Sequence, residues 1–476
     1  MNDFRAVLGS ALFAWTGLVS SATASQSSDT SPATKPNLVL IVADDLGYAD
    51  VGFNGCEDIP TPSIDRIAKD GVVFTNGYVT GAVCGPSRAG LITGRYQDRF
   101  GCGNNPTVNP AVPNGVPRSE RMISELLGPA GYESKAIGKW HLGTHPGLHP
   151  RDRGFDEFYG FLTGGHNYFP DNLTLEDLSE VNQKWAWYRT KLLDNGRRVG
   201  TSKYLTDELS DKAVEFIERD RATDSESPFF LYLCYNAPHT PLQATEAYLA
   251  RFEHIEDQRR RTYAAMVSAM DDGIGRVLDA IDRCGAADNT IVVFLSDNGG
   301  ATNNASRNTP LRGHKSSPFE GGIRVPFAIR WPDVAEPGSI YHHPVSSLDI
   351  AATIVEAAGP DARAQVRETH PLDGVDLRPF LSGETDAPPH QTLLWRWHAR
   401  DEGVIRSGDQ KLIDRSEQED LLFNLSTDLR ERQNLLKNAI AEDGRASTLR
   451  SALEAWYEEL IPPAHPGLGS WTFDDD

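Results

Sequence analysis

The stretch NLVLIVADD at residues 37–45 joins an unbroken apolar run to two adjacent carboxylates. Continuous apolar residues with β-branched members are typical of a strand buried on both faces, as in a parallel sheet. Ligands of open α/β sheets bind outside the carboxyl ends of the strands. Asp44 and Asp45 therefore stand where a functional site is expected.

Similar short runs recur along the chain, and helical patterns lie between them. The runs are 229–235 (FFLYLCY), 290–295 (TIVVFL) and 325–331 (VPFAIRW), with weaker candidates at 72–79 and 132–137. The clearest helical pattern spans 263–281, where apolar residues recur at spacings of three and four. Alternating strands and helices predict an α/β sheet covered by helices on both faces.

The pattern changes after about residue 385. A helical stretch at 446–460 follows four short strand-like pieces at 393–397, 403–406, 410–414 and 421–425. Short strands separated by turns predict a small antiparallel sheet with one helix. We therefore expect a main domain at 37–385, which carries the site residues described below, and a C-terminal α+β subdomain at 386–476.

Composition and charge narrow the classes of function. The chain has 476 residues, enough for two or three domain-sized units, and 46 basic against 67 acidic residues give a net charge of −21. This balance argues against nucleic acid as a partner, because the phosphate backbone selects basic faces. An anionic substrate is still compatible, since a pocket can be locally basic. Five cysteines exclude a scaffold built on disulfides.

Residues 1–24 have the pattern of a secretion signal. Arg5 precedes an uncharged apolar run, which ends at the A-x-A cleavage pattern Ala22-Thr23-Ala24. The run is shorter than the ~20 apolar residues that a membrane span needs. Residues 25–36 are rich in Ser, Thr and Pro and predict a flexible lead-in. We expect an exported protein, periplasmic or secreted, that is cleaved near Ala24 and has no membrane span.

Two acidic pairs follow predicted strands. Asp44 and Asp45 follow the first strand, and Asp297 and Asn298 follow the strand at 290–295. A lone Asp pair is more often a turn or a cap. Two pairs at strand ends offer three carboxylates and one amide, an oxygen-rich set that suits a hard divalent cation such as calcium or magnesium.

The sequence CGPSRAGLITGR at residues 84–95 places a nucleophile where a helix is predicted to begin. Pro86 suits the first helical turn. Cys84 would then lie at the helix N-terminus, where free N–H groups and the dipole favour an anion. Arg88 follows one turn later on the same face and would bring a guanidinium to that anion. A lone Cys is usually a small buried hydrophobe, but this spacing favours a functional role.

Four further basic residues are candidates for the same site: Lys139, His141, His239 and Lys315. Lys139 and His141 are two apart and would share a face in an extended segment. His239 follows the predicted strand at 229–235. Each residue alone is more often an ordinary surface or hydrogen-bonded side chain, and spacing along the chain does not assemble them.

Together these residues resemble the sulfatase family of the alkaline-phosphatase-like superfamily. The run from Cys84 to Arg88, with Thr93-Gly94 behind it, matches the family signature without a gap, and the resemblance covers nearly the whole chain after residue 36. It implies a large mixed, mostly parallel sheet sandwiched by helices. It also implies one calcium ion held by Asp44, Asp45, residue 84, Asp297 and Asn298, and a sulfate surrounded by Arg88, Lys139, His141, His239 and Lys315.

The resemblance further implies hydrolysis of sulfate esters. A maturation enzyme would convert Cys84 to formylglycine, and one hydroxyl of its hydrated form would attack sulfur. His239, with Lys315, would protonate the leaving alcohol, and His141 would help the second hydroxyl expel sulfate. Export suits a sulfated carbohydrate, such as polysaccharide-derived oligosaccharides, as the substrate. Small aryl sulfates are the alternative.

Three other functions are weighed against this one. A phosphonate or phosphodiester hydrolase could use the same modified residue. A non-catalytic glycan-binding protein would be favoured by the loss of Cys84, Arg88 or a metal ligand, but all are present. A thiol hydrolase with Cys84 as nucleophile leaves the Asp pairs without a role. His166, Asn167 and residues 395–397 are equally interpretable as substrate contacts or as packing residues.

Overall fold

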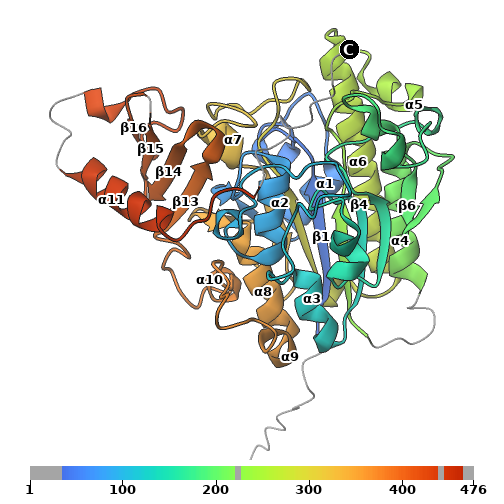
Figure 1. Ribbon diagram of the computed structural model, residues 1–476, viewed down its shortest axis with the longest axis horizontal. Coiled ribbons are helices and arrows are strands. Elements are labelled where there is room, and N and C mark those ends of the chain that lie inside the picture. The colour runs from blue at the N-terminus through green and yellow to red at the C-terminus, as the bar shows by residue number, and fades with distance from the viewer. Residues whose placement is uncertain (1–34, 220–226, 417, 438–443, 465–476) are drawn as a thin grey trace, which may run out of the picture. The chain divides into compact units, whose positions relative to one another are not determined.

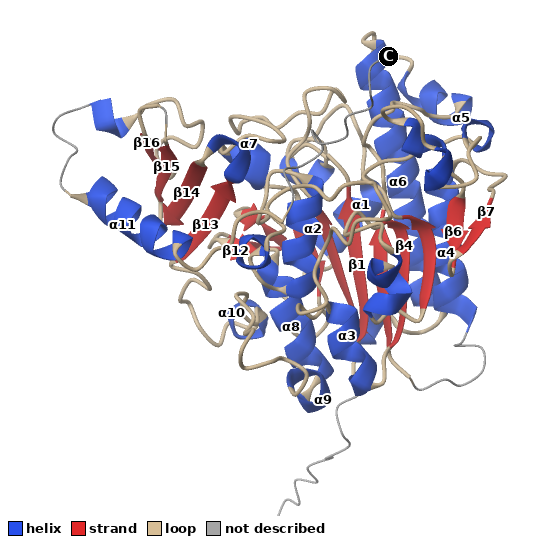
Figure 2. Cartoon of the chain, viewed as in Figure 1, coloured by secondary structure: helices blue, strands red, loops and turns tan. Residues whose placement is uncertain are grey.

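The computed structural model describes residues 35–219, 227–416, 418–437 and 444–464. The predicted secretion signal and most of the lead-in lie outside these ranges and stay predictions. The described chain builds a large sheet flanked by helices and a smaller sheet near α11 (Figures 1 and 2).

The large sheet has ten strands in the order β11-β2-β10-β9-β1-β8-β4-β5-β6-β7. The five central strands, from β9 to β5, run parallel to one another, whereas β10, β6 and β7 pair antiparallel with their neighbours. The predicted mixed, mostly parallel sheet is therefore confirmed. Its strands are β1 Asn37–Ala43, β2 Val72–Phe74, β4 Glu133–Lys139, β5 Glu157–Phe161, β6 Leu192–Asp194, β7 Arg197–Val199, β8 Phe229–Cys234, β9 Thr290–Ser296, β10 Phe327–Arg330 and β11 Ser339–Tyr341.

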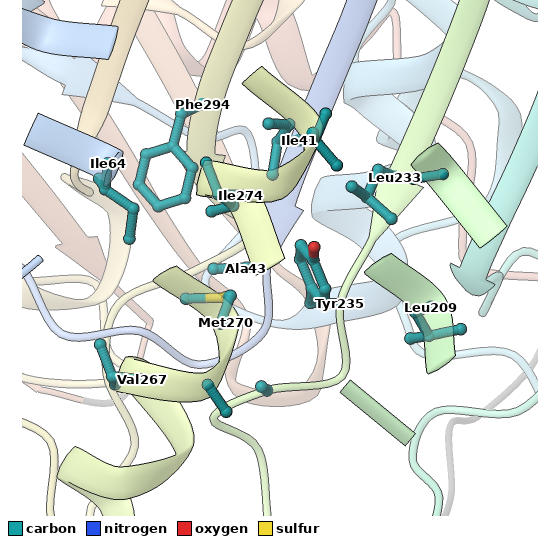
Figure 3. Close-up of a cluster of buried hydrophobic side chains, with 14 of the residues drawn as sticks. Ile41, Ala43, Ile64, Leu209, Leu233, Tyr235, Val267, Met270, Ile274 and Phe294 are labelled. Atoms are coloured by element: carbon teal, nitrogen blue, oxygen red, sulfur yellow. The ribbon is translucent and has the colours of Figure 1, made fainter. Parts of the chain in front are cut away.

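Helices cover both faces of this sheet because the central strands are apolar on both. In β1, Val39 and Ile41 point to the core shared with α1, α4 and α6, while Leu38 and Leu40 point to the core shared with α2, α3 and α8. Figure 3 shows Ile41 of the first core among side chains of α6, β8 and β9. Fully burying one such side chain stabilises the fold by about 1.5–3 kcal/mol. The unbroken apolar run at 37–43 thus dictates a sheet packed between two helical layers.

The longest described helix, α6, extends beyond the predicted range of 263–281. It begins at Gln258 because the Asp257 side chain accepts a hydrogen bond from the Arg260 N–H at 2.8 Å and so caps the first turn. Among the described helices, none is long and apolar enough to cross a bilayer. The helices are α1 Pro62–Lys69, α2 Cys84–Thr93, α3 Ile123–Leu127, α4 Leu205–Arg219, α5 Glu246–Leu249, α6 Gln258–Arg283, α7 Glu320–Ile323, α8 Leu348–Ala358, α9 Pro360–Arg363, α10 Arg378–Leu381 and α11 Arg445–Tyr457.

Two predicted strands differ from the structure. The run at 72–79 divides into β2 and β3 (Gly77–Tyr78), which pairs with β12 (Val345–Ser346) in a separate two-stranded sheet. The chain turns at Thr75 and Asn76, and at Gly77, where β3 begins, a Cβ atom would lie 2.7 Å from the Phe327 side chain. The run at 325–331 shortens to β10, which begins after Pro326 because this residue has no N–H to donate to the ladder. Strand β10 lies antiparallel to β9.

The C-terminal region forms an antiparallel sheet with one helix, as predicted. Its strands are β13 Thr392–Trp397, β14 Glu402–Ser407, β15 Gln410–Arg415 and β16 Leu421–Asn424, in that order. One face packs on Leu449 and Leu453 of α11. The other face contacts the main domain, where the Trp395 indole donates to the Val79 carbonyl at 2.7 Å.

A buried ion cluster fastens this sheet to the main domain. The Lys411 Nζ of β15 lies 2.9 Å from Glu320 Oε1 of α7 and 2.8 Å from Glu431 Oε1. Burial opposes the charge of Glu320, but Lys411 and two arginines outweigh it and lower its pKa to about 2. Burial raises the pKa of Glu431 to about 7. One lysine therefore bridges both buried carboxyl groups, and two arginines support Glu320 as well.

Replacing Lys411 should destabilise the protein strongly. Lys411→Met removes the cation but keeps the chain length, so that Glu431 loses its ion-pair partner and Glu320 keeps only the two arginines. We expect the free energy of unfolding to fall by about 3–5 kcal/mol, measured by urea denaturation. Lys437→Met, at an exposed lysine of the same region, should cost less than about 0.5 kcal/mol. Equal losses in the two variants would contradict this role of Lys411.

Candidate active site

The two acidic pairs meet at one edge of the large sheet. Strands β1 and β9 are parallel neighbours with Ala43 opposite Ser296, so Asp44 and Asp45 lie beside Asp297 and Asn298. The Asn298 amide donates to Asp45 Oδ1 at 2.7 Å, and the Asp45 N–H donates to Asp297 Oδ1 at 3.3 Å. All four side chains are buried. The structure thus brings together the four oxygen-bearing residues that follow these strands.

Helix α2 begins at Cys84, as the sequence predicted, and directs this residue at the acidic pairs. The Cys84 thiol donates to Asp44 Oδ1 at 3.5 Å, and the Lys315 ammonium donates to its sulfur at 3.2 Å. The Gly85 N–H of the first turn donates to the Asn105 side chain at 2.8 Å, which holds the helix start in place. Cys84 is only 2% exposed.

Each buried carboxylate of the cluster pairs with one cation. Lys139 Nζ lies 2.6 Å from Asp44 Oδ2, and Lys315 Nζ lies 2.7 Å from Asp45 Oδ1. The Arg88 Nε atom donates to Asp297 Oδ2 at 2.8 Å. Three negative and three positive charges therefore balance within the site. This balance is what allows so many charges to be buried together.

The cations favour the ionised form of Asp44, whereas burial shifts Asp297 in the opposite direction. Burial disfavours the charged form of Asp44, but Lys139, Arg88 and Lys315 outweigh it and hold the pKa well below its usual value. Burial and the charge of Asp44 raise the pKa of Asp297 to about 6. Burial also disfavours the charge of Lys315, yet Asp45 holds its pKa well above the usual value.

The two histidines at the site are neutral near pH 7. Burial, followed by the charges of Lys139 and Arg88, holds the pKa of His141 well below its usual value. Burial also lowers the pKa of His239, although Asp44 and Asp45 oppose the shift. His239 Nδ1 lies 2.6 Å from the Thr240 carbonyl, and Nε2 lies 3.6 Å from Asp45 Oδ2. Neutral imidazoles are suited to accept protons.

His141 reaches the site by a different backbone path from the one predicted. Strand β4 ends at Lys139, and His141 has a φ of +55° instead of an extended conformation. A Cβ atom on Gly164 would lie 2.6 Å from His141 Nε2, so this glycine leaves the space that the ring occupies. Lys139 and His141 are therefore close through a turn, and they do not share one face of a strand.

The donor atoms at the site fit a metal ion. Ligand atoms of Asp44, Asp45, Cys84 and His239 all lie within 4.8 Å of one another. The Asn298 Oδ1 atom is buried and has no hydrogen-bond partner among the described residues. Carboxylate and amide oxygens are the ligands of hard cations. A cation placed here would give the orphaned Asn298 oxygen a partner.

A cavity of about 560 Å³ opens over the cluster. His141, His239 and Lys315 line it, together with Trp185, Trp187 and Tyr188. The sequence analysis missed these three aromatic residues. The signal that marks them is the run WAWY at 185–188, which stands within an otherwise polar segment.

Two other candidate contacts are packing residues. His166 is fully buried on Phe161, and its ring nitrogens lie 2.8 and 3.0 Å from the carbonyls of Thr190 and Asn167. Trp395 is buried between the C-terminal sheet and the main domain. All five cysteines are free.

Comparison with known proteins places this arrangement in a family. A profile of the sulfatase family matches residues 36–360. N-acetylgalactosamine-6-sulfatase of Mus musculus is 34% identical over 363 residues, which cover 73% of this chain and 66% of that protein. The crystal structure of Ps i-CgsB in complex with k-i-k-neocarrahexaose is 41% identical, with a TM-score of 0.83, and the match covers 90% of this chain and 94% of that one.

A more distant likeness concerns the fold alone. The phosphonate monoester hydrolase of Agrobacterium radiobacter matches with a TM-score of 0.63 at 20% identity, over 89% of this chain and 96% of that one. Such a likeness carries no information on the substrate of this chain. It does agree with the predicted alkaline-phosphatase-like architecture.

The environment of Cys84 makes a prediction about its reactivity. Burial raises the pKa of the Cys84 thiol to about 12, although Lys139 and Lys315 oppose the shift. In protein whose residue 84 is still cysteine, iodoacetamide at pH 8 should therefore label Cys84 at least about tenfold more slowly than the partly exposed Cys284. Peptide mass spectrometry measures both rates, and urea-unfolded protein is the control. Faster labelling of Cys84 would contradict this account.

Proposed function

The chain belongs to the sulfatase family, whose members are sulfuric ester hydrolases, and we propose that it releases inorganic sulfate from sulfated carbohydrate oligosaccharides. The observation that carries the proposal is the position of Cys84. It lies at the start of α2, in contact with Asp44 and Lys315, beneath a cavity that His239 and Lys315 line. A sulfate ester bound in this cavity would bring its sulfur toward residue 84.

The charges of the site support an anionic substrate on an acidic protein. The net charge of the whole chain is −21, but the site balances its three carboxylates with Lys139, Lys315 and Arg88. A divalent cation added to this neutral set would leave a local excess of positive charge. Such an excess attracts a sulfate ester and opposes the charge that builds on its oxygens during attack.

Two groups complete the site in this proposal. Asp44, Asp45, Asp297, Asn298 and residue 84 would hold a calcium ion, and a formylglycine-generating enzyme would convert Cys84. When present, the ion would supply positive charge beside the sulfuryl oxygens, and the hydrated aldehyde would supply the attacking hydroxyl. Lys139 and Lys315 would position the sulfate through its oxygens.

The two histidines would move the protons. A bound anionic ester raises the pKa of His239, because a nearby negative charge favours the imidazolium. His239 Nδ1 faces the Thr240 carbonyl, so Nε2 is the atom that would give a proton to the leaving alcohol. His141 would accept the proton that is lost when sulfate departs, since burial keeps it neutral. Lys315, charged beside Asp45, would assist His239.

Relatives support a carbohydrate as the substrate. The matching crystal structure holds k-i-k-neocarrahexaose, and the matching mouse protein is named for a sulfated amino sugar. We therefore place sulfated carbohydrate oligosaccharides first, ahead of small aryl sulfates. Export through the predicted signal at residues 1–24 would bring the enzyme to such an extracellular polymer.

The raised pKa of Cys84 argues against direct thiol chemistry. A thiol hydrolase needs a thiolate, which positive neighbours and partial exposure usually stabilise. Here burial raises the pKa of Cys84 to about 12, so the unconverted residue would be a protonated thiol at neutral pH. A non-catalytic scaffold would have no need for the complete set of paired charges around it.

Sulfate release tests the proposed activity. Wild-type protein with formylglycine at residue 84 should release sulfate from k-i-k-neocarrahexaose, measured by ion chromatography. Cys84→Ala should lower the rate by ~10³-fold or more, because the nucleophile is lost. Cys284→Ala, at a cysteine on the end of α6, should keep the wild-type rate. Hydrolysis of phosphonate or phosphate diesters, with no sulfate release from any glycan, would contradict the proposal.

Removal of calcium should lower stability independently of activity. Ligands that bind only the native state raise the melting temperature, so EDTA should lower the midpoint by several degrees and excess calcium should restore it. Asn298→Ala removes one proposed oxygen ligand and should at least halve the shift. Asn303→Ala, at an exposed amide of the same loop, should retain the full shift. Equal calcium shifts in both variants would argue against Asn298 as a ligand.

A further inference from the structure

Trp185 is an unusual residue to find at the surface. Among the described residues, the exposed large hydrophobic side chains are Trp185, Ile340 and Ile461, and Trp185 is 49% exposed. Of these three side chains, Trp185 lines the cavity over the active site. Aromatic side chains that line a cavity together with a few polar groups are typical of a ligand contact.

The aromatic rings form a series that leads away from His239. The Tyr188 ring lies 6.4 Å from the His239 ring, and the Trp185 ring lies 5.8 Å from Tyr188. The ring of the buried Trp187 lies 5.1 Å from the Trp185 ring and supports it. Trp185 is therefore one ring further from the reacting centre than Tyr188.

The backbone holds Trp185 in a strained conformation. Its φ is +69°, a region that costs a bulky residue about 1–3 kcal/mol. The turn is fixed around it, because the Tyr188 N–H donates to the Trp185 carbonyl at 3.1 Å and the Asn167 N–H donates to the Tyr188 carbonyl at 3.0 Å. Asparagine or glycine would fit this conformation without strain. Trp185 thus occupies the position at a cost in stability, which is a feature of binding sites.

The chemistry of such a ring points to a sugar. One face of a pyranose carries C–H groups, which are apolar and slightly positive, and the face of an indole is flat and negative. Stacking buries the C–H face of the sugar and the face of the indole against each other, and it leaves no unsatisfied polar atom between them. The cavity, at about 560 Å³, lies within the ~300–1,000 Å³ range of sites that enclose a ligand much larger than sulfate.

We propose that Trp185 is the stacking platform for the sugar ring next to the sulfated ring. The sulfated ring then lies against Tyr188, with its ester over residue 84. This inference rests on the proposed sulfatase function, and it specifies a substrate of at least two linked sugar rings. Trp185 touches the substrate without touching the reacting atoms, so it sets affinity and length preference.

The test compares substrates of one ring and of several rings. Trp185→Asn removes the platform but keeps a residue that tolerates positive φ. With k-i-k-neocarrahexaose, it should lower kcat/KM about tenfold or more, mainly through a higher KM. With 4-nitrophenyl sulfate, the change should stay within about twofold. Trp185→Phe should retain most of the activity on the hexasaccharide, and Ile340→Ala is the control for loss of an exposed apolar side chain.

Stability gives an independent readout. Because the native φ is unfavourable for tryptophan, Trp185→Asn should melt at or above the wild-type temperature while its KM rises. The proposed role of Trp185 would be wrong if Trp185→Asn changed the KM for the hexasaccharide less than the KM for 4-nitrophenyl sulfate, or changed neither KM.

A binding measurement shows whether the proposed role of Trp185 or the proposed sulfatase activity is wrong. In the Cys84→Ala background, calorimetry should show tenfold weaker binding of k-i-k-neocarrahexaose after Trp185→Asn. If no glycan releases sulfate but binding still depends on Trp185, the platform stands and the proposed activity is wrong. If sulfate is released and neither binding nor KM depends on Trp185, the activity stands and the platform is wrong.

Discussion

Burying Asp44, Asp45 and Asp297 side by side is costly unless each carboxylate meets a cation, and the rest of the site follows from this requirement. Lys139, Lys315 and Arg88 come from three different parts of the chain and supply those cations. A carboxylate that lost its partner would be an uncompensated buried charge. The balanced set therefore fixes the positions of β1, β9, α2 and the loop with Lys315 relative to Cys84.

The C-terminal sheet contributes to the same arrangement from a distance. Arg312 donates to the Glu431 carbonyl at 2.6 Å, and Glu431 Oε2 accepts from the Glu320 N–H at 2.8 Å. These two contacts hold both ends of the loop that carries Lys315, whose own N–H donates to the Gly300 carbonyl at 3.1 Å. Glu431, which follows the small sheet and pairs with Lys411 of β15, thus supports the loop of the cation that touches Cys84 and Asp45, although this region supplies none of the proposed catalytic residues.

The sequence predicts those parts of the fold and site whose cause is local. Strands β1, β8 and β9 are recognised because they are continuous apolar runs, and the start of α2 because Pro86 and Arg88 follow Cys84 at helical spacing. Short strands such as β6 and β7 have too few residues to show a period. The pairing of Lys139 with Asp44, 95 positions apart, depends on sheet register, which the chain does not display. His141 and Trp185 depend on positive φ angles, which no spacing reveals.

In the proposed function, the charge cluster serves a converted residue 84. Its most direct test is to prepare the protein with graded amounts of formylglycine, measure the converted fraction by peptide mass, and follow sulfate release from k-i-k-neocarrahexaose. We expect a rate proportional to the converted fraction, which extrapolates to zero when all chains keep cysteine. A rate that does not change with the converted fraction would contradict it.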